Sequence, residues 1–404
     1  MMRWLIAIAV FVMSGTSALP DQNSSTAAHM LAKPYAQFGF EVMRELAAKQ
    51  PDGNIFISPT SIAVALAMTS NGANGTTRDA ILATLHSDPR ALGPQNIDIF
   101  NAANRALVEQ MGTTTAVQLS MANALWLQQG FPVNPSFNQV LQADYSAQAE
   151  NLDFRNPAST QTINAWVAKH TNDRIPKLLD QIDPATVVIL TNAIAFKGKW
   201  TLPFDPKETQ SHDFKNADGT AHAVPMMKHT AKYAYANANG LEAIRLPYSD
   251  GTFAMYVVLP QDAARMQSFL QQLTPEVFTN LATSLQTRGG TIELPRFTIK
   301  YGATLNTILA KLGMGIAFGS GANFKGINET RPLAISEVRH ASFLSIDEEG
   351  TEAAAATSVG IRALAMRVEP PPFHMVVDRP FFVAIRDERN GQILFTGAIA
   401  EPVD

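Results

Sequence analysis

Residues 187–200 of this chain read VVILTNAIAFKGKW. From residue 187 to residue 196 the stretch is almost entirely apolar, and many of its side chains are β-branched. An apolar run of this length fits a strand and is too short for an ordinary buried helix. We therefore predict a buried central strand here, against which the other elements of the chain must pack.

Helices and further strands surround this run in an irregular order. Residues 30–49 carry apolar side chains at helical spacing. Ser58 followed by Pro59 is typical of a helix N-terminus and predicts a helix that ends near residue 71. We also expect a helix at 164–175, a strand pair at 117–127, strands at 54–57, 241–247, 253–260 and 291–297, and a C-terminal hairpin of 381–385 with 393–395. This order predicts an α+β fold.

The composition is that of a globular protein with a large core. The chain has 404 residues, of which 46% are hydrophobic and 16% charged, and no Pro/Gly/Ser-rich linker divides it. We therefore predict one large domain over residues 19–404. The formal net charge is −4 and the basic residues are scattered, so the sequence offers no clustered stripe for a nucleic acid or another long polyanion. Cysteine is absent, which excludes disulfides, thiol catalysis and Cys-ligated zinc.

The first residues are typical of a secretory signal peptide. Arg3 precedes an apolar run at 4–13, and small residues follow at 14–18. This pattern predicts a signal peptide over residues 1–18, cleavage after Ala18, and a secreted protein with no membrane attachment. The alternative is an N-terminal anchor, although the run is shorter than the roughly 20 apolar residues that span a bilayer.

Motifs for catalysis are missing from the sequence. There is no Gly-x-Ser-x-Gly elbow, no His-Glu-x-x-His pattern and no Gly-Lys-Ser/Thr loop, so we predict neither a cofactor nor a metal site. Ser58 or Ser61 with His340 would be the candidate nucleophile and base of a hydrolase. We favour a helix cap for Ser58 and a buried hydrogen-bond network for His340.

Residues 347–358 read DEEGTEAAAATS, an acidic corner and a glycine followed by small side chains. The segment has little to bury and no group with which to catalyse a reaction. Small side chains allow it to enter a crowded place as an extended strand, which indicates a moving part. No proline occurs from Gly350 to Met366, so every backbone N–H there is able to join a strand ladder.

Six parts of the chain match one known family when they are read in order. They are residues 54–62, the helix residues Asn164, Trp166, Val167, Thr171 and Ile175, and residues 190–200, 294–297, 348–357 and 378–382. Together they resemble the serpins, the serine-protease-inhibitor superfamily, over residues 30–402. The resemblance implies a serpin fold with three β-sheets, eight or nine helices and an exposed reactive-centre loop at about residues 348–374.

The resemblance also implies roles for polar and aromatic residues. Ser58, Ser61, Asn192 and His340 would form the shutter, where the main sheet must part. Trp200 would lie at the breach, where the loop enters the sheet. These residues would control conformation and would carry no chemistry.

The hinge of the loop decides whether a serpin inhibits. Its predicted residues are Glu348, Gly350, Thr351, Ala353, Ala355 and Thr357. Alternate side chains of a strand share a face, so the small residues from Thr351 to Thr357 face inward together and Glu352 faces solvent. Non-inhibitory serpins often carry a bulky, charged or proline-containing hinge. With this hinge, the resemblance implies an inhibitor that traps a serine protease as a covalent acyl-enzyme. We also expect the protein to be a monomer.

The spacing usual in the family places the scissile bond between Leu364 and Ala365. A leucine there predicts a target with an apolar primary pocket, which is chymotrypsin-like, elastase-like or subtilisin-like. Residues 369–374 make the far side of the loop longer than is usual, so Arg362, Met366 and Arg367 remain alternatives.

Three other functions remain open. A non-inhibitory serpin that acts as a carrier or chaperone would be cleaved by proteases without forming a covalent complex. A hydrolase would show turnover that depends on Ser58 and His340. A structural secreted protein would gain no heat resistance when its loop is cut.

Overall fold

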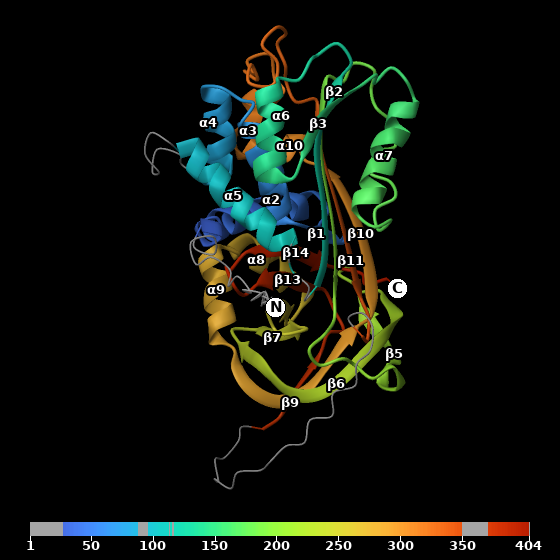
Figure 1. Cartoon of the computed structure of the whole chain (residues 1–404). Coiled ribbons are helices and arrows are strands. Elements are labelled where there is room, and N and C mark those ends of the chain that lie inside the picture. The colour runs from blue at the N-terminus through green and yellow to red at the C-terminus, as the bar shows by residue number, and fades with distance from the viewer. Residues whose placement is uncertain (1–26, 88–95, 113, 115–116, 350–370, 404) are drawn as a thin grey trace, which may run out of the picture.

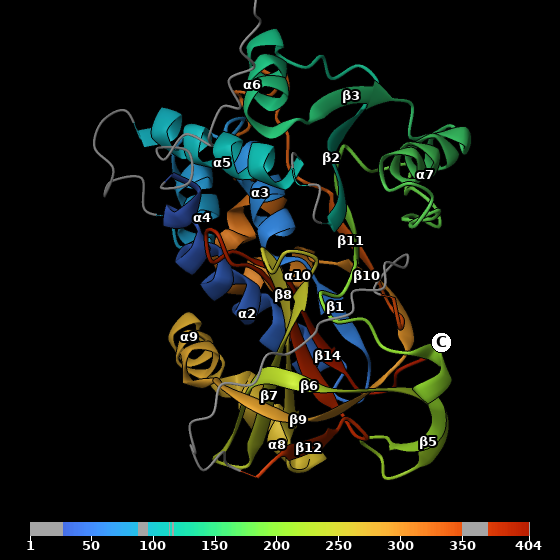
Figure 2. The ribbon, with the colours of Figure 1, turned by 60° about the horizontal axis from the view of Figure 1, so that its bottom comes forward.

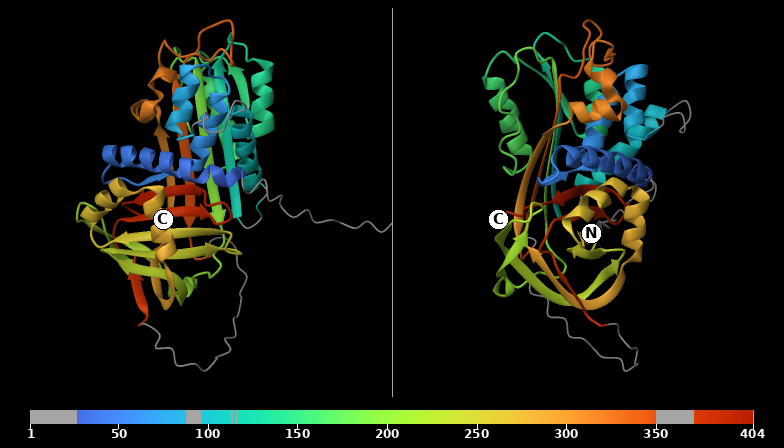
Figure 3. Two further views of the ribbon diagram at one scale, coloured as in Figure 1. Left: turned by 90° about the vertical axis from the view of Figure 1, so that its left-hand side faces the viewer. Right: turned by 180° about the vertical axis from the view of Figure 1, so that it is seen from behind.

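The structure, a computed structural model, describes residues 27–87, 96–112, 114, 117–349 and 371–403. A five-stranded sheet stands between helix α7 (Ala158–His170) on one face and a group of helices on the other, as Figure 1 and the right-hand view of Figure 3 show. A second, strongly curved sheet closes one end of the molecule (Figure 1). The predicted α+β fold is confirmed.

The five-stranded sheet has the predicted central strand in its middle. Its order is β10 (Phe297–Thr304), β11 (Glu337–Ile346), β4 (Val188–Gly198), β2 (Val117–Gln128) and β3 (Gln148–Leu152). Strand β4 is buried along almost its whole length. It pairs with β11 in parallel and with β2 in antiparallel orientation. Helices cover both faces of this part of the sheet, which explains why the strand reads as a continuous apolar run.

The second sheet is one continuous hydrogen-bonded surface. Its order is β1 (Ile55–Ile57), β14 (Ile393–Ile399), β13 (Phe381–Asp387), β8 (Phe253–Pro260), β7 (Leu241–Tyr248), β6 (Ala221–Ala238), β9 (Gln286–Pro295) and β12 (Phe373–Val376), with β5 (Gln210–Lys215) beside β6. Strand β6 has 18 residues and pairs first with β5 and later with β7, while β9 runs along its middle (Figure 2). The long β6 thus joins the two smaller sheets that the family resemblance implies.

Helix α3 (Pro59–Ser70) is the innermost helix, and all of its residues are buried. Ser58 caps it, because the Ser58 side chain accepts a hydrogen bond from the Ser61 N–H at 3.1 Å, as predicted. The other α-helices in the described residues are α2 (Ala32–Lys49), α4 (Thr76–Thr84), α5 (Asn96–Gly112), α6 (Pro135–Tyr145), α8 (Ala263–Gln272), α9 (Pro275–Ser284) and α10 (Asn306–Leu309). Within the described part of the chain, no helix is both long and apolar enough to cross a membrane.

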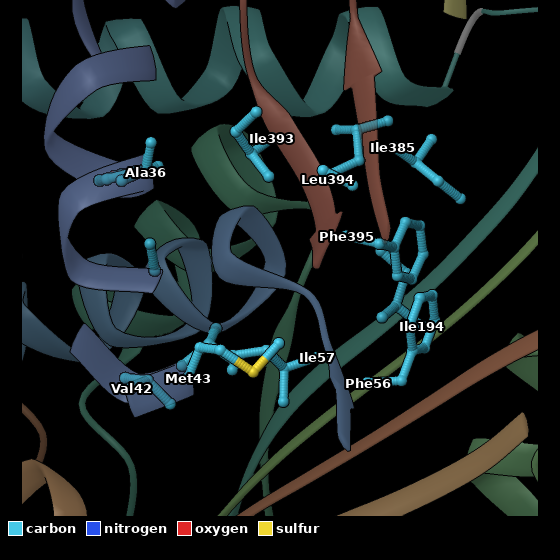
Figure 4. Close-up of a cluster of buried hydrophobic side chains, with 14 of the residues drawn as sticks. Ala36, Val42, Met43, Phe56, Ile57, Ile194, Ile385, Ile393, Leu394 and Phe395 are labelled. Carbon is cyan, nitrogen blue, oxygen red and sulfur yellow. The ribbon is translucent and has the colours of Figure 1, made fainter. Parts of the chain in front are cut away.

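The main hydrophobic core lies where the two sheets and α3 meet. Figure 4 shows Phe56 of β1, Ile194 of β4 and Phe395 of β14 facing one another in this core. The Phe56 and Phe395 rings are stacked with their centroids 5.1 Å apart, and Phe196 meets Phe395 edge-on at 5.7 Å. These contacts fix the position of β4 against the second sheet.

Three sequence-based boundaries are wrong. Residues 117–127 form one continuous strand instead of a pair, since they contain no glycine or proline to turn the chain. The helix predicted at 164–175 begins earlier and ends at His170, after which Asn172 and Asp173 adopt positive φ angles. The strand predicted at 291–297 is divided at Arg296 between β9 and β10.

Candidate functional site

The four residues predicted as the shutter come together at the centre of the five-stranded sheet. Ser58 and Ser61 stand at the start of α3, Asn192 lies on β4 and His340 lies on β11. The strand register pairs His340 directly with Asn192 across the β4–β11 seam. All four residues are buried. We call these residues the shutter cluster.

Hydrogen bonds link α3 to both strands through this cluster. His340 Nδ1 lies 2.6 Å from Asn192 Oδ1, and the Ser58 N–H donates to His340 Nε2 at 3.3 Å. Asn192 Nδ2 donates to the Ser61 carbonyl oxygen at 3.0 Å and to Ser61 Oγ at 2.5 Å. The cluster therefore ties the two strands of the seam to one helix end.

These contacts fix the protonation state of His340. Nε2 faces a backbone N–H and must accept, so the ring proton sits on Nδ1 and is donated to Asn192 Oδ1. Burial lowers the pKa of His340 from 6.5 to about 3, because desolvation penalises the charged imidazolium. The ring is consequently neutral at neutral pH.

Two neighbours of the cluster were missed in the sequence. Asn123 on β2 lies opposite Asn192 and accepts a hydrogen bond from its Nδ2 at 2.5 Å. Ser342 Oγ on β11 donates to the Phe56 carbonyl oxygen at 2.5 Å. A polar residue among apolar ones on the buried face of a strand could have indicated these two positions, since a buried polar group needs a hydrogen-bond partner.

The seam between β4 and β11 closes incompletely at the C-terminal ends of these strands. Its last paired residues are Phe196 and Leu344. The pairings on either side continue further, to Gly198 between β4 and β2 and to Ile346 between β11 and β10. At this end of the sheet, the pairing of β4 with β11 therefore stops before the pairings on either side, beside the point where the chain leaves β11.

Trp200 lies at that point. Its indole is buried and stacked on Tyr248, with ring centroids 4.4 Å apart. The Trp200 Nε1–H donates to the Asp347 carbonyl oxygen at 2.9 Å. The Trp200 backbone N–H donates to the Glu349 carbonyl oxygen at 3.3 Å. Trp200 therefore holds the first and the third of the three residues that follow β11.

Glu348 is the one predicted hinge residue inside the described part of the chain. It is buried, accepts a hydrogen bond from Thr209 Oγ1 at 2.7 Å, and forms an ion pair with Arg296 at 3.4 Å. Its carbonyl oxygen accepts from the Phe204 N–H at 2.8 Å. The start of the hinge is thus fixed by side-chain and backbone contacts. The following predicted residues lie outside the described residues: Gly350, Thr351, Ala353, Ala355, Thr357, Arg362, Leu364, Ala365, Met366 and Arg367.

The geometry of Ser58 and His340 does not suit a hydrolase. Ser58 Oγ caps α3, and the imidazole Nε2 meets the Ser58 backbone N–H instead of its hydroxyl. A nucleophile and its base must share a hydrogen bond, and a substrate must reach them, whereas both residues are fully buried. In the described ranges, no three His, Asp or Glu side chains gather into a group able to hold a metal.

Comparison with known proteins agrees with this arrangement. The family model described as "Serpin (serine protease inhibitor)" matches residues 33–402. The chain belongs to the serpin family. This serpin is 33% identical over 386 residues to Serpin A3-2 of Bos taurus, an alignment that covers 95% of this chain and 92% of the bovine one.

Two solved serpin structures have the same fold. The mouse protein-Z dependent protease inhibitor superposes with a TM-score of 0.85 at 26% identity, covering 95% of this chain and 100% of the other. Human thyroxine-binding globulin in complex with its hormone superposes with a TM-score of 0.84 at 27% identity, covering 94% and 100%. Most members of the family are protease inhibitors, and the family also includes a thyroxine-binding member.

Proposed function

We propose that this serpin is a suicide inhibitor of serine proteases. A target protease attacks the loop between Leu364 and Ala365, and its serine forms an acyl-enzyme with the new carboxyl end. The cleaved loop then inserts between β4 and β11 and carries the protease along. Fourteen residues of strand would span roughly 46 Å. Distortion of the protease's oxyanion hole and triad then stops deacylation.

The observation that carries this proposal is the parallel pairing of β4 with β11. A segment that turns back from the end of β11 runs opposite to both strands. It is therefore able to replace one parallel ladder of eight residue pairs with two antiparallel ladders, which are the more stable kind. At a net contribution of about 1 kcal/mol per hydrogen bond, the additional ladder supplies several kcal/mol.

The sequence after Glu349 suits such an insertion. Thr351, Ala353 and Ala355 are small enough to face the crowded interior of the sheet, and Glu352 would face solvent. In this proposal, the shutter cluster holds the seam closed before cleavage, and Trp200 with Glu348 fixes the point from which insertion proceeds. Leu364 directs the inhibitor to chymotrypsin-like, elastase-like or subtilisin-like enzymes, while Arg362, Met366 and Arg367 define the alternative registers.

Incubation with chymotrypsin, elastase and trypsin tests the mechanism. We expect a covalent complex that survives boiling in detergent. Mass spectrometry of the released loop fragment should place the cut after Leu364. Cleaved serpin without any complex would refute inhibition, and a fragment that begins elsewhere would refute only the register.

A carrier function is the second candidate, because the chain has a hollow of about 450 Å³ between α2 and α9. The ion pair of Lys33 with Glu276 at 2.7 Å supplies polar groups to a lining that also includes apolar side chains such as Phe40 and Ile393. The other polar side chains of the lining are His29, Thr279, Asn280 and Arg386. Thyroxine-binding globulin, a hormone carrier by its name, has the same fold. Fluorescence titration with thyroxine, combined with the absence of a covalent protease complex, would favour the carrier.

The remaining parts of the proposal concern the chain as a whole. We propose that residues 1–18 direct export and are removed, and that residues 19–404 form one serpin domain that acts as a secreted monomer. The apolar run at 4–13 supports the first statement. N-terminal sequencing of the protein from the culture medium, together with its mass by light scattering, tests both.

A further inference from the structure

A second hollow, of about 360 Å³, lies on the α7 side of the five-stranded sheet. One wall is the connection that follows α7, from Arg174 to Asp180, and the other is the β10–β11 edge. Phe343 identifies this face of the sheet, because it packs with Val167 of α7 in one buried cluster. Figure 1 shows α7 standing on this face. The protease reaction proposed above needs no ligand in this hollow.

The floor of this hollow is formed by minimal side chains. Gly302 on β10 is paired directly with Ala341 on β11, and residues directly opposite one another on antiparallel strands share a face. A Cβ atom added to Gly302 would meet only ordinary van der Waals distances, the nearest at 3.9 Å, so the space above it is open. The absence of side chains here creates the cavity.

The rim of the hollow is cationic, and its charges are only partly compensated. Lys177 pairs with Asp180 at 2.6 Å, and Arg339 pairs with Glu337 at 2.6 Å. Arg174 and Lys300 have no carboxylate partner among the residues that the structure describes. The hollow therefore carries an excess of two positive charges.

Arg174 and Lys300 both line this hollow, and both are neighbours of Phe343. The Arg174 guanidinium lies over the Phe343 ring, 5.5 Å from its centroid, and Lys300 is the direct cross-strand partner of Phe343. Two uncompensated like charges that line one hollow repel each other. An anion between the two cations would relieve that repulsion, and the planar guanidinium suits two oxygens of a phosphate or carboxylate.

We propose that this hollow binds a compact, multiply charged oxyanion between Arg174 and Lys300. The anion bridges the α7–β4 connection to the β10–β11 edge, so it binds best when these two parts lie together. Insertion of a strand between β4 and β11 would separate them. A ligand stabilises the state that it binds more tightly, so the anion slows insertion. This last step rests on the proposed inhibitory function, whereas binding itself does not.

Calorimetric titration of the whole mature serpin with pyrophosphate tests the binding, at an ionic strength held constant with NaCl. We expect saturable binding that Lys300→Gln weakens about three- to tenfold. Gly302→Leu should abolish it by filling the hollow without changing any charge. Lys325→Gln removes an exposed lysine elsewhere and should bind like the wild type. Equal binding by all four proteins, or none by the wild type, would overturn the proposal, and Lys300→Gln keeps the test valid if Gly302→Leu does not fold.

The effect on insertion is read from the rate of covalent complex formation with chymotrypsin. The compared quantity is the rate with pyrophosphate divided by the rate without it, measured for each protein separately. We expect this ratio to be below one for the wild type and for Lys325→Gln, and near one for Gly302→Leu. If pyrophosphate does not change the rate of complex formation, the regulatory step is refuted and the inhibitory function still stands. Saturable binding without any covalent complex refutes the inhibitory function and leaves the anion site intact.

Discussion

Replacement of His340 by glutamine should remove a pH dependence of stability that the buried imidazole creates. The pKa of His340 is lowered from 6.5 to about 3 in the folded protein, so between these values only the unfolded chain takes up the proton. The unfolded state is therefore favoured as the pH falls below 6.5. The stabilisation is fully present above that pH and is lost progressively toward pH 3. From pH 7.5 to pH 5 the loss is about 2 kcal/mol, at 1.36 kcal/mol per pH unit.

Glutamine is a suitable replacement because it keeps both hydrogen-bonding roles. Its carbonyl oxygen can accept from the Ser58 N–H and its amide can donate to Asn192 Oδ1. Thermal unfolding followed by circular dichroism should show the wild-type midpoint falling by about 2–3 °C more than that of His340→Gln over this pH range. His212→Gln changes an exposed histidine on β5 and should follow the wild type. Parallel pH profiles for His340→Gln and the wild type would refute the assignment of a neutral, buried imidazole.

Three further predictions concern the loop and its point of attachment. Thr351→Arg should convert the inhibitor into a substrate that yields mostly cleaved protein on a denaturing gel, because the arginine would face the sheet interior, whereas Glu352→Arg should keep the covalent complex. Leu364→Arg should move complex formation from chymotrypsin to trypsin, and an unchanged preference would contradict the register. Trp200→Ala should cost about 3–5 kcal/mol through the lost packing on Tyr248. Trp200→Phe should cost only about 1–2 kcal/mol through the lost hydrogen bond to Asp347, with both read from denaturant midpoints.

Elements with a strong local signal were predictable from the sequence. The apolar run around Ile194 predicted a buried strand, the Ser58-Pro59 pair predicted a helix N-terminus, and Asn390-Gly391 predicted the turn between β13 and β14. Gly391 there adopts a φ of +77°, which explains the glycine. Boundaries without such a signal failed, as at Arg296, where one extended segment is shared between two sheets.

The candidate site was only partly predictable for the same reason. Ser58, Ser61, Asn192 and His340 were found through the family resemblance, and no periodicity of the chain would have grouped them. Their contacts join residues far apart in sequence, such as Asn192 and His340. Asn123 and Ser342 were not predicted, because their neighbours in the chain are apolar and their hydrogen-bond partners lie on other elements.

The sequence by itself predicted most of the strands and helices, and it predicted which segment has side chains small enough for insertion, since these properties follow from side chains that are neighbours in the chain. Tertiary structure decided the rest. It made β4 and β11 parallel neighbours, and it brought Arg174 and Lys300 to the lining of one hollow although the basic residues look scattered in the sequence. Strand pairing sets such contacts over long separations, and the energy of each depends on burial and register that only the folded chain provides.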